Sequence, residues 1–311
     1  MKLAPIAFFA YKRPEHTKQS LESLARNHSA ELSELFIFCD GSKKPEDNEA
    51  VDQVRQIVKS QQWCGQVHII EREQNIGLAN SIIHGVTELC NKYGKVIVLE
   101  DDLILSPFFL EYMNEALNFY EKDSKVFQIS GYMFPVKLTS VSDTLFLPFI
   151  ASWGWATWER SWEHFDAEMS GYTSLKNNRN LKCKFNLNNS YPYFEMLEQQ
   201  IKGNIDSWAI RWYLSVFMLD GLTLYPKNSL VKNIGFDGSG THCEATLNFN
   251  SEIYESRILS MSTNIQADYT ITNIVFAYLR SIGQSTSFIR RIKQKFINLF
   301  RKIKYLKSQK I

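Results

Sequence analysis

The chain has 311 residues, of which 44% are hydrophobic and 22% charged, a composition typical of a globular protein with one large or two modest domains. The net charge of +2 hides an asymmetry, because nine of the 35 Lys and Arg residues follow Ser287 whereas no Asp or Glu follows Asp268. Subtracting these nine leaves 26 basic against 33 acidic residues in the body of the chain. An acidic body argues against nucleic-acid binding as the main function.

The cysteines and the apolar runs favour a cytoplasmic protein. Cysteine pairs with CxxC spacing are absent, and we expect reduced, mostly buried thiols at Cys39, Cys64, Cys90, Cys183 and Cys243. The apolar N-terminus is broken by Pro5 and followed by Lys12 and Arg13, which favours a first β-strand over a signal peptide. No apolar run approaches the roughly 20 residues that cross a bilayer, so we expect no transmembrane anchor.

The first hundred residues alternate apolar, β-prone runs with helical patterns, as βαβ units do. The expected strands are residues 5–10, 35–39, 67–71 and 95–99. The expected helices are residues 15–27, 47–61 and 78–93. This pattern predicts a nucleotide-binding α/β fold with a mostly parallel, Rossmann-like sheet flanked by helices.

The second half of the chain has a less regular pattern. Residues 108–121 have helical apolar spacing after the helix-start signal Ser106-Pro107, and residues 129–165 are rich in aromatics and glycine. The asparagine-rich residues 175–191 are typical of a mobile connecting loop, and residues 207–219 of a helix. No internal repeat or sharp domain boundary is visible before the C-terminal tail.

Polar residues follow each of the four expected strands. In open parallel sheets, ligands bind outside the carboxyl ends of the strands, so these residues are the first candidates for a binding site. They are Lys12-Arg13-Pro14, Asp40-Gly41-Ser42, Asn75-Ile76-Gly77 and Glu100-Asp101-Asp102.

The acidic triplet Glu100-Asp101-Asp102 ends a strongly apolar strand, Val96-Ile97-Val98-Leu99. Three adjacent carboxylates repel one another, and a divalent cation relieves that repulsion. Hard oxygen donors suit Mn²⁺ or Mg²⁺, which could hold a diphosphate leaving group. The alternative is a solvated acidic turn before the next helix. The strand placement favours the metal site.

The order of these motifs resembles that of GT-A glycosyltransferases. The run 96–112, an apolar strand followed by Glu-Asp-Asp and Ser-Pro-Phe-Phe-Leu-Glu-Tyr, resembles the metal-binding segment of N-acetylglucosaminyltransferase I and related enzymes. Residues 11–14 resemble the loop whose arginine contacts the nucleotide, and residues 38–41 the turn whose aspartate contacts uracil. Residues 75–80 are similar to an Asn-x-Gly element beside the donor in family 2 glycosyltransferases.

The resemblance covers residues 5–112 and implies a role for each matched residue. Asp102 would ligate Mn²⁺ or Mg²⁺, Asp101 would face the ribose, and Glu100 would lie near the donor sugar. The implied nucleotide contacts are Arg13, Asp40 and Asn75. The sequence departs here from a plain Asp-x-Asp motif, which leaves open which acid touches which atom.

Residues 204–208 resemble the segment that carries the general base of the inverting enzyme, which implies that Asp206 is the catalytic base. An inverting transfer needs one carboxylate to accept the proton of the acceptor hydroxyl. The alternative reading is that Asp206 only caps the helix 207–219. Asp237 is a competing base.

Residues 225–242 resemble the late strand and the flexible loop that closes over bound donor in these enzymes. His242 falls where many GT-A enzymes have a histidine that ligates the metal or contacts phosphate. The alternative is a surface or packed histidine.

Trp153, Trp155, Trp158 and Trp162 cluster within ten residues. They could form an aromatic platform for acceptor sugars, or they could fill the core, as most large aromatics do. We expect at most one or two of the chain's tryptophans to touch ligand, with Trp155 and Trp208 as the acceptor-binding candidates.

The C-terminal tail has an amphipathic, basic pattern. Apolar residues recur at helical spacing among eight interleaved Lys and Arg residues between 290 and 307, without any acid. This pattern favours a helix lying on an anionic membrane surface. The alternative is a helix folded back onto the acidic body.

Together these features predict a GT-A domain at residues 1–270, with a nucleotide-binding half at 1–112, an acceptor-side half at 113–270 and a helical tail at 271–311. The expected activity is a metal-dependent, inverting transfer from a UDP-sugar, by resemblance UDP-N-acetylglucosamine, to a glycan or lipid-linked acceptor of surface polysaccharide or lipopolysaccharide. The expected location is the inner face of the plasma membrane. A nucleotidyltransferase is one alternative, although the N-terminus lacks a Gly-rich phosphate loop. A non-catalytic carbohydrate-binding or scaffold protein is the other.

Overall fold

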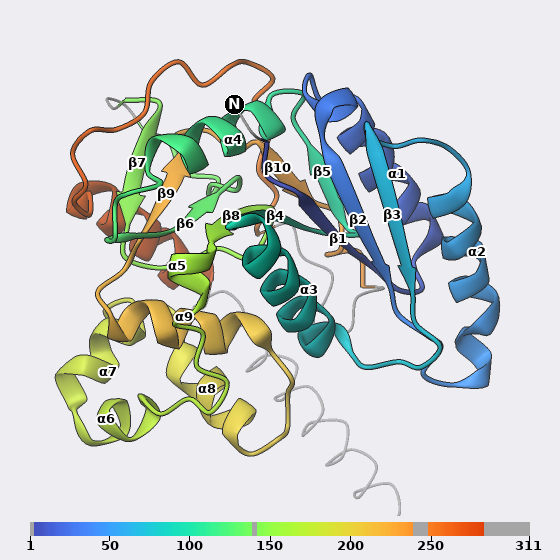
Figure 1. The fold of residues 1–311 in the computed structure, drawn as a ribbon. Coiled ribbons are helices and arrows are strands. Elements are labelled where there is room, and N and C mark those ends of the chain that lie inside the picture. Colours follow the sequence, from blue (N-terminus) through green and yellow to red (C-terminus); the bar gives the residue numbers. More distant parts are fainter. Residues whose placement is uncertain (1–2, 139–141, 239–247, 283–311) are drawn as a thin grey trace, which may run out of the picture.

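Four apolar segments of the first hundred residues form neighbouring strands in the computed structural model, which describes residues 3–138, 142–238 and 248–282. They are β1 (Ile6–Ala10), β2 (Glu34–Cys39), β3 (Gln66–Glu71) and β4 (Lys95–Glu100). All pair in parallel in the order β3-β2-β1-β4 (Figure 1). Their carboxyl ends therefore share one edge of the sheet, as the alternating sequence pattern predicts.

The same sheet continues through four strands of mixed direction. These are β8 (Trp155–Trp158), β6 (Val126–Ser130), β9 (Leu222–Pro226) and β7 (Thr144–Leu147), in that spatial order beyond β4. β8 runs antiparallel to both β4 and β6, β9 is parallel to β6, and β7 is antiparallel to β9. The eight-stranded sheet joins the two halves of the chain around one apolar core.

Helices pack on both faces of this sheet. They are α1 (Pro14–Ala25), α2 (Asn48–Lys59), α3 (Leu78–Tyr93), α4 (Phe109–Phe119) and α5 (Glu159–Trp162), with short 3₁₀ turns at Ala30–Leu32 and Pro45–Asp47. Side chains three positions apart on a strand point to opposite faces. On β8, Trp158 donates to the Leu117 carbonyl of α4 (2.9 Å), whereas Trp155 lies on the side of α5, with its ring centroid 5.8 Å from that of Trp162 and the two rings tilted by 39°. α3 approaches the sheet closely, because a Cβ on Gly85 would lie 2.8 Å from the Phe9 ring.

A two-stranded ribbon projects from the edge where the parallel strands end. β5 (Leu103–Leu105) follows the acidic triplet, and β10 (Val231–Asn233) pairs with it in antiparallel fashion. β5 is not among the elements expected from the sequence, because three residues are too few for a clear periodicity. β10 falls within residues 225–242, where the resemblance implied a late strand and a loop. The ribbon brings the segment after residue 233 to the edge of the sheet.

The expected mobile loop at residues 175–191 is wrong, because helices α6 (Tyr172–Asn177) and α7 (Arg179–Phe185) occupy most of it. The run of asparagines suggested a loop, but Leu175, Phe185 and Leu187 bury their side chains in the core. Asn178 caps α7 by accepting from the backbone N–H groups of Asn180 and Leu181. Two asparagines then take positive φ angles where α7 ends, a conformation that asparagine tolerates.

Two further helices, α8 (Tyr193–Ile201) and α9 (Trp208–Met218), complete a helical layer below the sheet in Figure 1. The helix after Ser207 was expected, and its bounds differ by one residue at each end. The connection between α8 and α9 carries Asp206.

The described chain ends in helical residues 269–282, which pack into the same core. Ile271, Val275, Phe276 and Leu279 are at most 5% exposed. The tail boundary expected at residue 270 therefore falls beside a helix that belongs to the globular body. The basic tail sequence beyond residue 282 lies outside the described residues. Within the described residues, no helix combines the length and apolarity needed to span a bilayer.

Candidate active site

The candidate site lies at the shared carboxyl edge of β1, β2 and β4. Parallel pairing aligns Phe9 with Glu100 and Phe9 with Phe38, so the residues that follow these strands meet at one place. Arg13, Asp40 and the triplet 100–102 are therefore neighbours in the fold although up to 89 residues separate them in the chain. The sequence pattern correctly predicted this juxtaposition.

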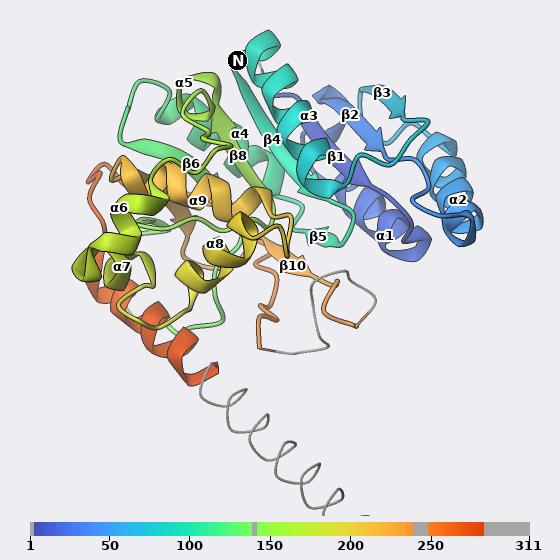
Figure 2. The same cartoon turned by 90° about the horizontal axis from the view of Figure 1, so that it is seen from below.

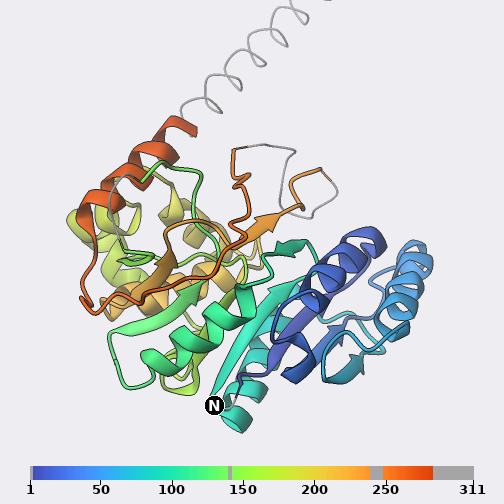
Figure 3. The ribbon, with the colours of Figure 1, turned by 90° about the horizontal axis from the view of Figure 1, so that it is seen from above.

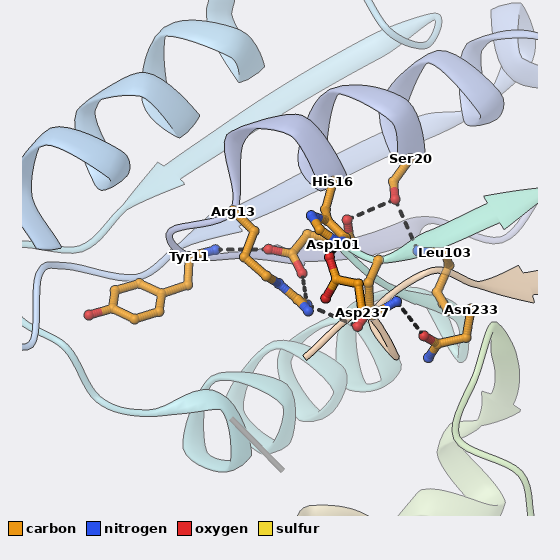
Figure 4. A network of polar contacts seen from close by, with 10 residues as sticks. Tyr11, Arg13, His16, Ser20, Asp101, Leu103, Asn233 and Asp237 are labelled. Atoms are coloured by element: carbon orange, nitrogen blue, oxygen red, sulfur yellow. Dashed lines mark hydrogen bonds and ion pairs between the residues drawn. The ribbon is translucent and has the colours of Figure 1, made fainter. Parts of the chain in front are cut away.

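Arg13 joins the last two acids of the triplet. Its guanidinium forms ion pairs with Asp101 and, at 3.0 Å, with Asp102 Oδ2 (Figure 4). Burial alone would lower the pKa of Arg13, but the charges of Asp101 and Asp102 outweigh it and raise that pKa above its ordinary value. Arg13 thus stays protonated and neutralises part of the negative charge of the triplet.

Burial perturbs the pKa of two acids of the triplet, Glu100 and Asp101. Burial raises the pKa of Glu100 to about 8, and the charges of Asp102 and Asp101 add to this effect. Burial also raises the pKa of Asp101 despite the opposing influence of Arg13. The site is therefore short of positive charge, a property that favours binding of a cation.

Ser20 of α1 fixes the backbone of the triplet. Its hydroxyl donates to the Asp101 carbonyl (2.8 Å) and accepts from the Leu103 N–H (3.0 Å). The Tyr11 N–H also approaches Asp101 Oδ2, at 3.4 Å. Ser20 was not singled out from the sequence, because a serine inside a helix carries no signal of this long-range contact.

The segment after β10 lies directly against Asp102. The Ile234 N–H donates to the Asp102 carbonyl (2.8 Å), and a Cβ added to Gly235 would collide with the Asp102 carboxylate. Two residues later, Asp237 pairs with His16 of α1 at 3.2 Å (Figure 4). Asp237, the competing base, is thus held by a histidine at this edge.

Asp40 and Asn75 link the ends of β2 and β3. The Asp40 carboxylate accepts from the backbone N–H of Ile76 (3.1 Å) and of Gly77 (3.0 Å), and Asn75 donates to the Gly41 carbonyl (2.8 Å). A Cβ on Gly41 would lie 2.6 Å from the Glu73 carbonyl oxygen, so only glycine fits this close approach. Asp40 therefore orders the loop that leads into α3.

Asp206 reaches the same loop from the helical layer. Its Oδ2 lies 4.0 Å from the position of a Cβ on Gly77. Its Oδ1 pairs with Arg211 of α9, whose side chain is only 11% exposed. The alternative that Asp206 caps α9 is wrong, because Ser207 is the cap and accepts from the Ile210 N–H (3.3 Å). More than half of the Asp206 side chain, 56%, remains exposed.

The tryptophans expected to bind acceptor are in the core. Trp155 is 0% and Trp208 is 4% exposed, and the two indoles stack on each other with ring centroids 4.9 Å apart. In this structure neither offers an open face to a sugar, because each covers the other. Trp158 and Trp162 are also buried. Only Trp153 of this cluster is partly exposed, beside Phe236.

The metal-ligand prediction rests on Asp102 and His242. His242 lies outside the described residues. In the described part of the chain, no three His, Cys, Asp or Glu side chains gather as a metal-binding cluster. The ligand chemistry nevertheless fits a hard cation, because Asp102 presents carboxylate oxygens whose ion-pair partner within the described ranges is Arg13.

A family model for glycosyl transferase family 2 matches residues 6–182, which is 177 of the 311 residues. The chain therefore belongs to this family, and its α/β fold is of the GT-A type expected from the sequence. The match includes Arg13, Asp40, Asn75 and the acidic triplet, whereas Asp206 lies beyond it.

Three solved structures illustrate the similarity at low identity. A mannosyltransferase from Pyrobaculum calidifontis in complex with GDP-Man and Mn²⁺ is 12% identical, with a TM-score of 0.38, over 56% of this chain and 51% of that one. GalNAc-T7 with UDP, GalNAc and Mn²⁺ is 11% identical, with a TM-score of 0.47, over 79% and 45%. TarS residues 1–349 from S. aureus is 13% identical, with a TM-score of 0.41, over 74% and 60%. This chain thus aligns with about half of the first two. A search of curated protein sequences found no match.

Proposed function

We propose that this glycosyltransferase moves a sugar from a UDP-sugar to a hydroxyl group of a glycan or lipid-linked acceptor, with inversion at the anomeric carbon. The proposal rests on one observation, that the acidic cluster around Arg13 and the carboxylate of Asp206 both lie near the carboxyl edge of the sheet. The Arg13–Asp101–Asp102 cluster lies at the end of β4, and Asp206 approaches the neighbouring loop at Gly77.

The donor is proposed to bind along the edge formed by Arg13, Asp40, Asn75, Glu100 and Asp101. Backbone N–H groups hold Asp40 in place. Arg13 is the cation that could contact phosphate once Asp102 binds metal. The resemblance to the motifs of N-acetylglucosaminyltransferase I favours UDP-N-acetylglucosamine as the donor.

The proposed metal is Mn²⁺ or Mg²⁺, with Asp102 as a ligand and His242 as a second candidate. Such an ion supplies charge that stabilises a departing diphosphate. The chain's own contribution is to hold the Asp102 carboxylate still, through the backbone contact from Ile234 and the ion pair with Arg13.

Asp206 is proposed to accept the proton of the attacking acceptor hydroxyl. Because its side chain is 56% exposed, an acceptor can reach it from solvent. Arg211 pairs with Oδ1 of Asp206, so Oδ2 is the oxygen proposed to accept the proton. Asp237 is the weaker candidate, because His16 already engages its carboxylate. Family membership favours this transfer over the nucleotidyltransferase and scaffold alternatives.

The acceptor is proposed to belong to surface polysaccharide or lipopolysaccharide assembly at the cytoplasmic face of the plasma membrane. The basic composition after residue 287, with nine Lys and Arg residues and no acid, supports binding to an anionic membrane. Truncation after residue 287 is expected to weaken binding to anionic vesicles while transfer to a water-soluble acceptor persists. Unchanged vesicle binding would contradict this membrane role.

Thermal-shift measurements with a panel of nucleotide sugars, with and without Mn²⁺, test the donor and metal together. A ligand that binds only the native state at 100 times its Kd raises the free energy of unfolding by about 2.7 kcal/mol. We expect one UDP-sugar to raise the Tm only when Mn²⁺ is present, and Asp102→Ala to abolish that shift. If no nucleotide sugar changes the Tm in either condition, the proposal is wrong.

The variant Asp206→Asn separates binding from chemistry. It is expected to keep the donor-induced shift and to lose transfer by a factor on the order of a hundred or more, the usual contribution of a general base. Normal transfer by Asp206→Asn would exclude this residue as the base even if the donor site is correct.

A further inference from the structure

Two stretches of the chain carry basic residues and contain no acidic residue. Residues 169–194 carry four basic side chains, Lys176, Arg179, Lys182 and Lys184, and residues 269–311 carry ten. The remainder holds 21 basic and all 33 acidic residues. A nearly neutral chain thus contains a strongly acidic part and a purely basic part.

The fold brings these two acid-free stretches together. Arg280, on the helix formed by residues 269–282, donates to the Ser190 hydroxyl at 3.1 Å, in the segment that follows α7. Figures 2 and 3 both show this terminal helix, in orange-red, beside the helical layer of α6 and α7. The described chain ends at residue 282 on this side, and the remaining 29 residues carry nine of the ten basic residues of the second stretch.

The folded part of this basic face is firmly held. We define the basic face by Lys176, Arg179, Lys182, Lys184 and Arg280. Its helices are anchored from beneath by buried Leu175 and Phe185. The ammonium groups of Lys176 and Lys182 lie over the rings of Tyr172 and Phe194, at 5.7 and 4.6 Å from the ring centroids. Among the described residues, no ion pair joins any member of the face to a carboxylate.

Exposed apolar side chains flank the basic face. Met218, 39% exposed, lies close to Gly171 before α6, since a Cβ added there would be 2.7 Å from the Met218 side chain. The next residue, Leu219, is 49% exposed. Ile274 and Tyr269 on the terminal helix are 38% and 72% exposed. Basic groups with neighbouring exposed apolar side chains match the headgroup region of an anionic bilayer, which accepts both.

We propose that the basic face on α6, α7 and the terminal helix docks this glycosyltransferase on an anionic lipid surface. In this arrangement, the folded body itself contributes to docking. The face is carried by the same helical layer as α8 and α9, whose connection bears Asp206. Docking by this layer would keep the proposed base close to the lipid surface, where a lipid-linked acceptor resides.

A triple variant of the full chain, Lys176→Gln, Arg179→Gln and Lys184→Gln, tests the proposal. These three side chains are exposed, and none belongs to the proposed donor site or is the proposed base. Binding is measured by co-sedimentation with phosphatidylcholine vesicles that contain or lack phosphatidylglycerol. Each basic residue near an anionic surface contributes a factor of roughly five to binding, so the variant should bind anionic vesicles on the order of a hundredfold more weakly.

The matched control is Lys18→Gln, Lys122→Gln and Lys125→Gln, three exposed lysines on or beside other elements. It should bind anionic vesicles like the wild type, since it removes the same charge from outside the face. Circular dichroism and the donor-induced thermal shift should be unchanged in both variants, which separates a failure of docking from a failure of the proposed function.

Two outcomes would overturn the proposal. One is wild-type binding of anionic vesicles by the triple variant, or an equal loss in the control. The other is unchanged vesicle binding with loss of transfer to a water-soluble anionic glycan, which would assign the face to the acceptor instead.

Discussion

At the scale of single residues, charge compensation dominates the candidate site. Arg13 is the positive partner of Asp101 and Asp102, and Arg211 is the partner of Asp206. The first pairing was anticipated in part, since Arg13 and the triplet were assigned to one edge of the sheet. The second was not anticipated, because one arginine in the first turn of an apolar helix carries no distinguishing pattern.

Arg211 is predicted to position Asp206. Its Nε donates to the Ser207 carbonyl (3.2 Å). The backbone next to Asp206 therefore orients the guanidinium that pairs with the Asp206 carboxylate. Arg211→Gln should lower kcat on the order of tenfold, because a freely rotating base forfeits part of its contribution. Steady-state kinetics would measure this loss, with Lys202→Gln, an exposed residue nearby in the chain, as the control.

If Arg211 has only a structural role, its variant would lose stability without any change in kcat. Positioning predicts a different signature. The kcat of Arg211→Gln should fall while its Tm without ligand and its donor-induced rise in Tm stay near those of the wild type.

Gly235 is predicted to be needed as glycine. An added Cβ would collide with the Asp102 carboxylate and would lie 3.1 Å from an Arg13 nitrogen. Displacement of Asp102 by about 1 Å should reduce transfer on the order of a hundredfold. Kinetics of Gly235→Ala would check this, against Gly171→Ala, whose Cβ meets only the flexible side chains of Met218 and Leu214. Equal activity of the two variants would contradict the prediction.

At the scale of elements, local sequence signals were reliable for the regular segments. The helix expected at residues 78–93 is α3 with the same bounds, and β4 is one residue longer than expected. The elements that the sequence did not predict all depend on tertiary contacts. α6 and α7 are held by burial of a few apolar residues within a polar segment, and β5 and β10 exist only because they pair with each other.

Two helix caps allow a matched test of how α9 supports Asp206. Ser207 caps α9 and Asn178 caps α7. Replacing either by alanine should cost about 1 kcal/mol of unfolding free energy. Only Ser207→Ala should also reduce transfer, because residue 206 precedes that cap. Urea denaturation and kinetics on both variants measure the two effects, and parallel losses of activity would argue against this special role.

At the scale of the whole molecule, the globular body extends beyond the boundary expected at residue 270. The buried apolar side chains of residues 271–279 close the core beside β7 and Phe149. The basic, amphipathic pattern of residues 271–311 placed the expected boundary at residue 270, because the apolar residues of a surface helix and of a packed helix have the same spacing.

Truncation tests whether the helix after residue 270 belongs to the globular body or to a separate tail. Removing residues 271–311 exposes the sites of four core side chains, each worth about 1.5–3 kcal/mol, a loss comparable to the total stability of about 5–15 kcal/mol. We expect that variant not to fold, whereas truncation after residue 287 should keep a cooperative thermal transition. A folded protein ending at residue 270 would show that the terminal helix is dispensable.

The sequence by itself determined the α/β class, the four parallel strands and the edge where the acidic triplet lies. Those features depend on periodicity and on the fact that parallel strands end together, and both are local or generic properties. Only the tertiary structure decided that Gly235 lies against Asp102, that Arg211 holds Asp206, that Trp155 and Trp208 stack in the core, and that two acid-free stretches share one face. Each of these depends on contacts between residues whose spacing follows no repeating period. They become visible only when the sheet and helices have brought them together.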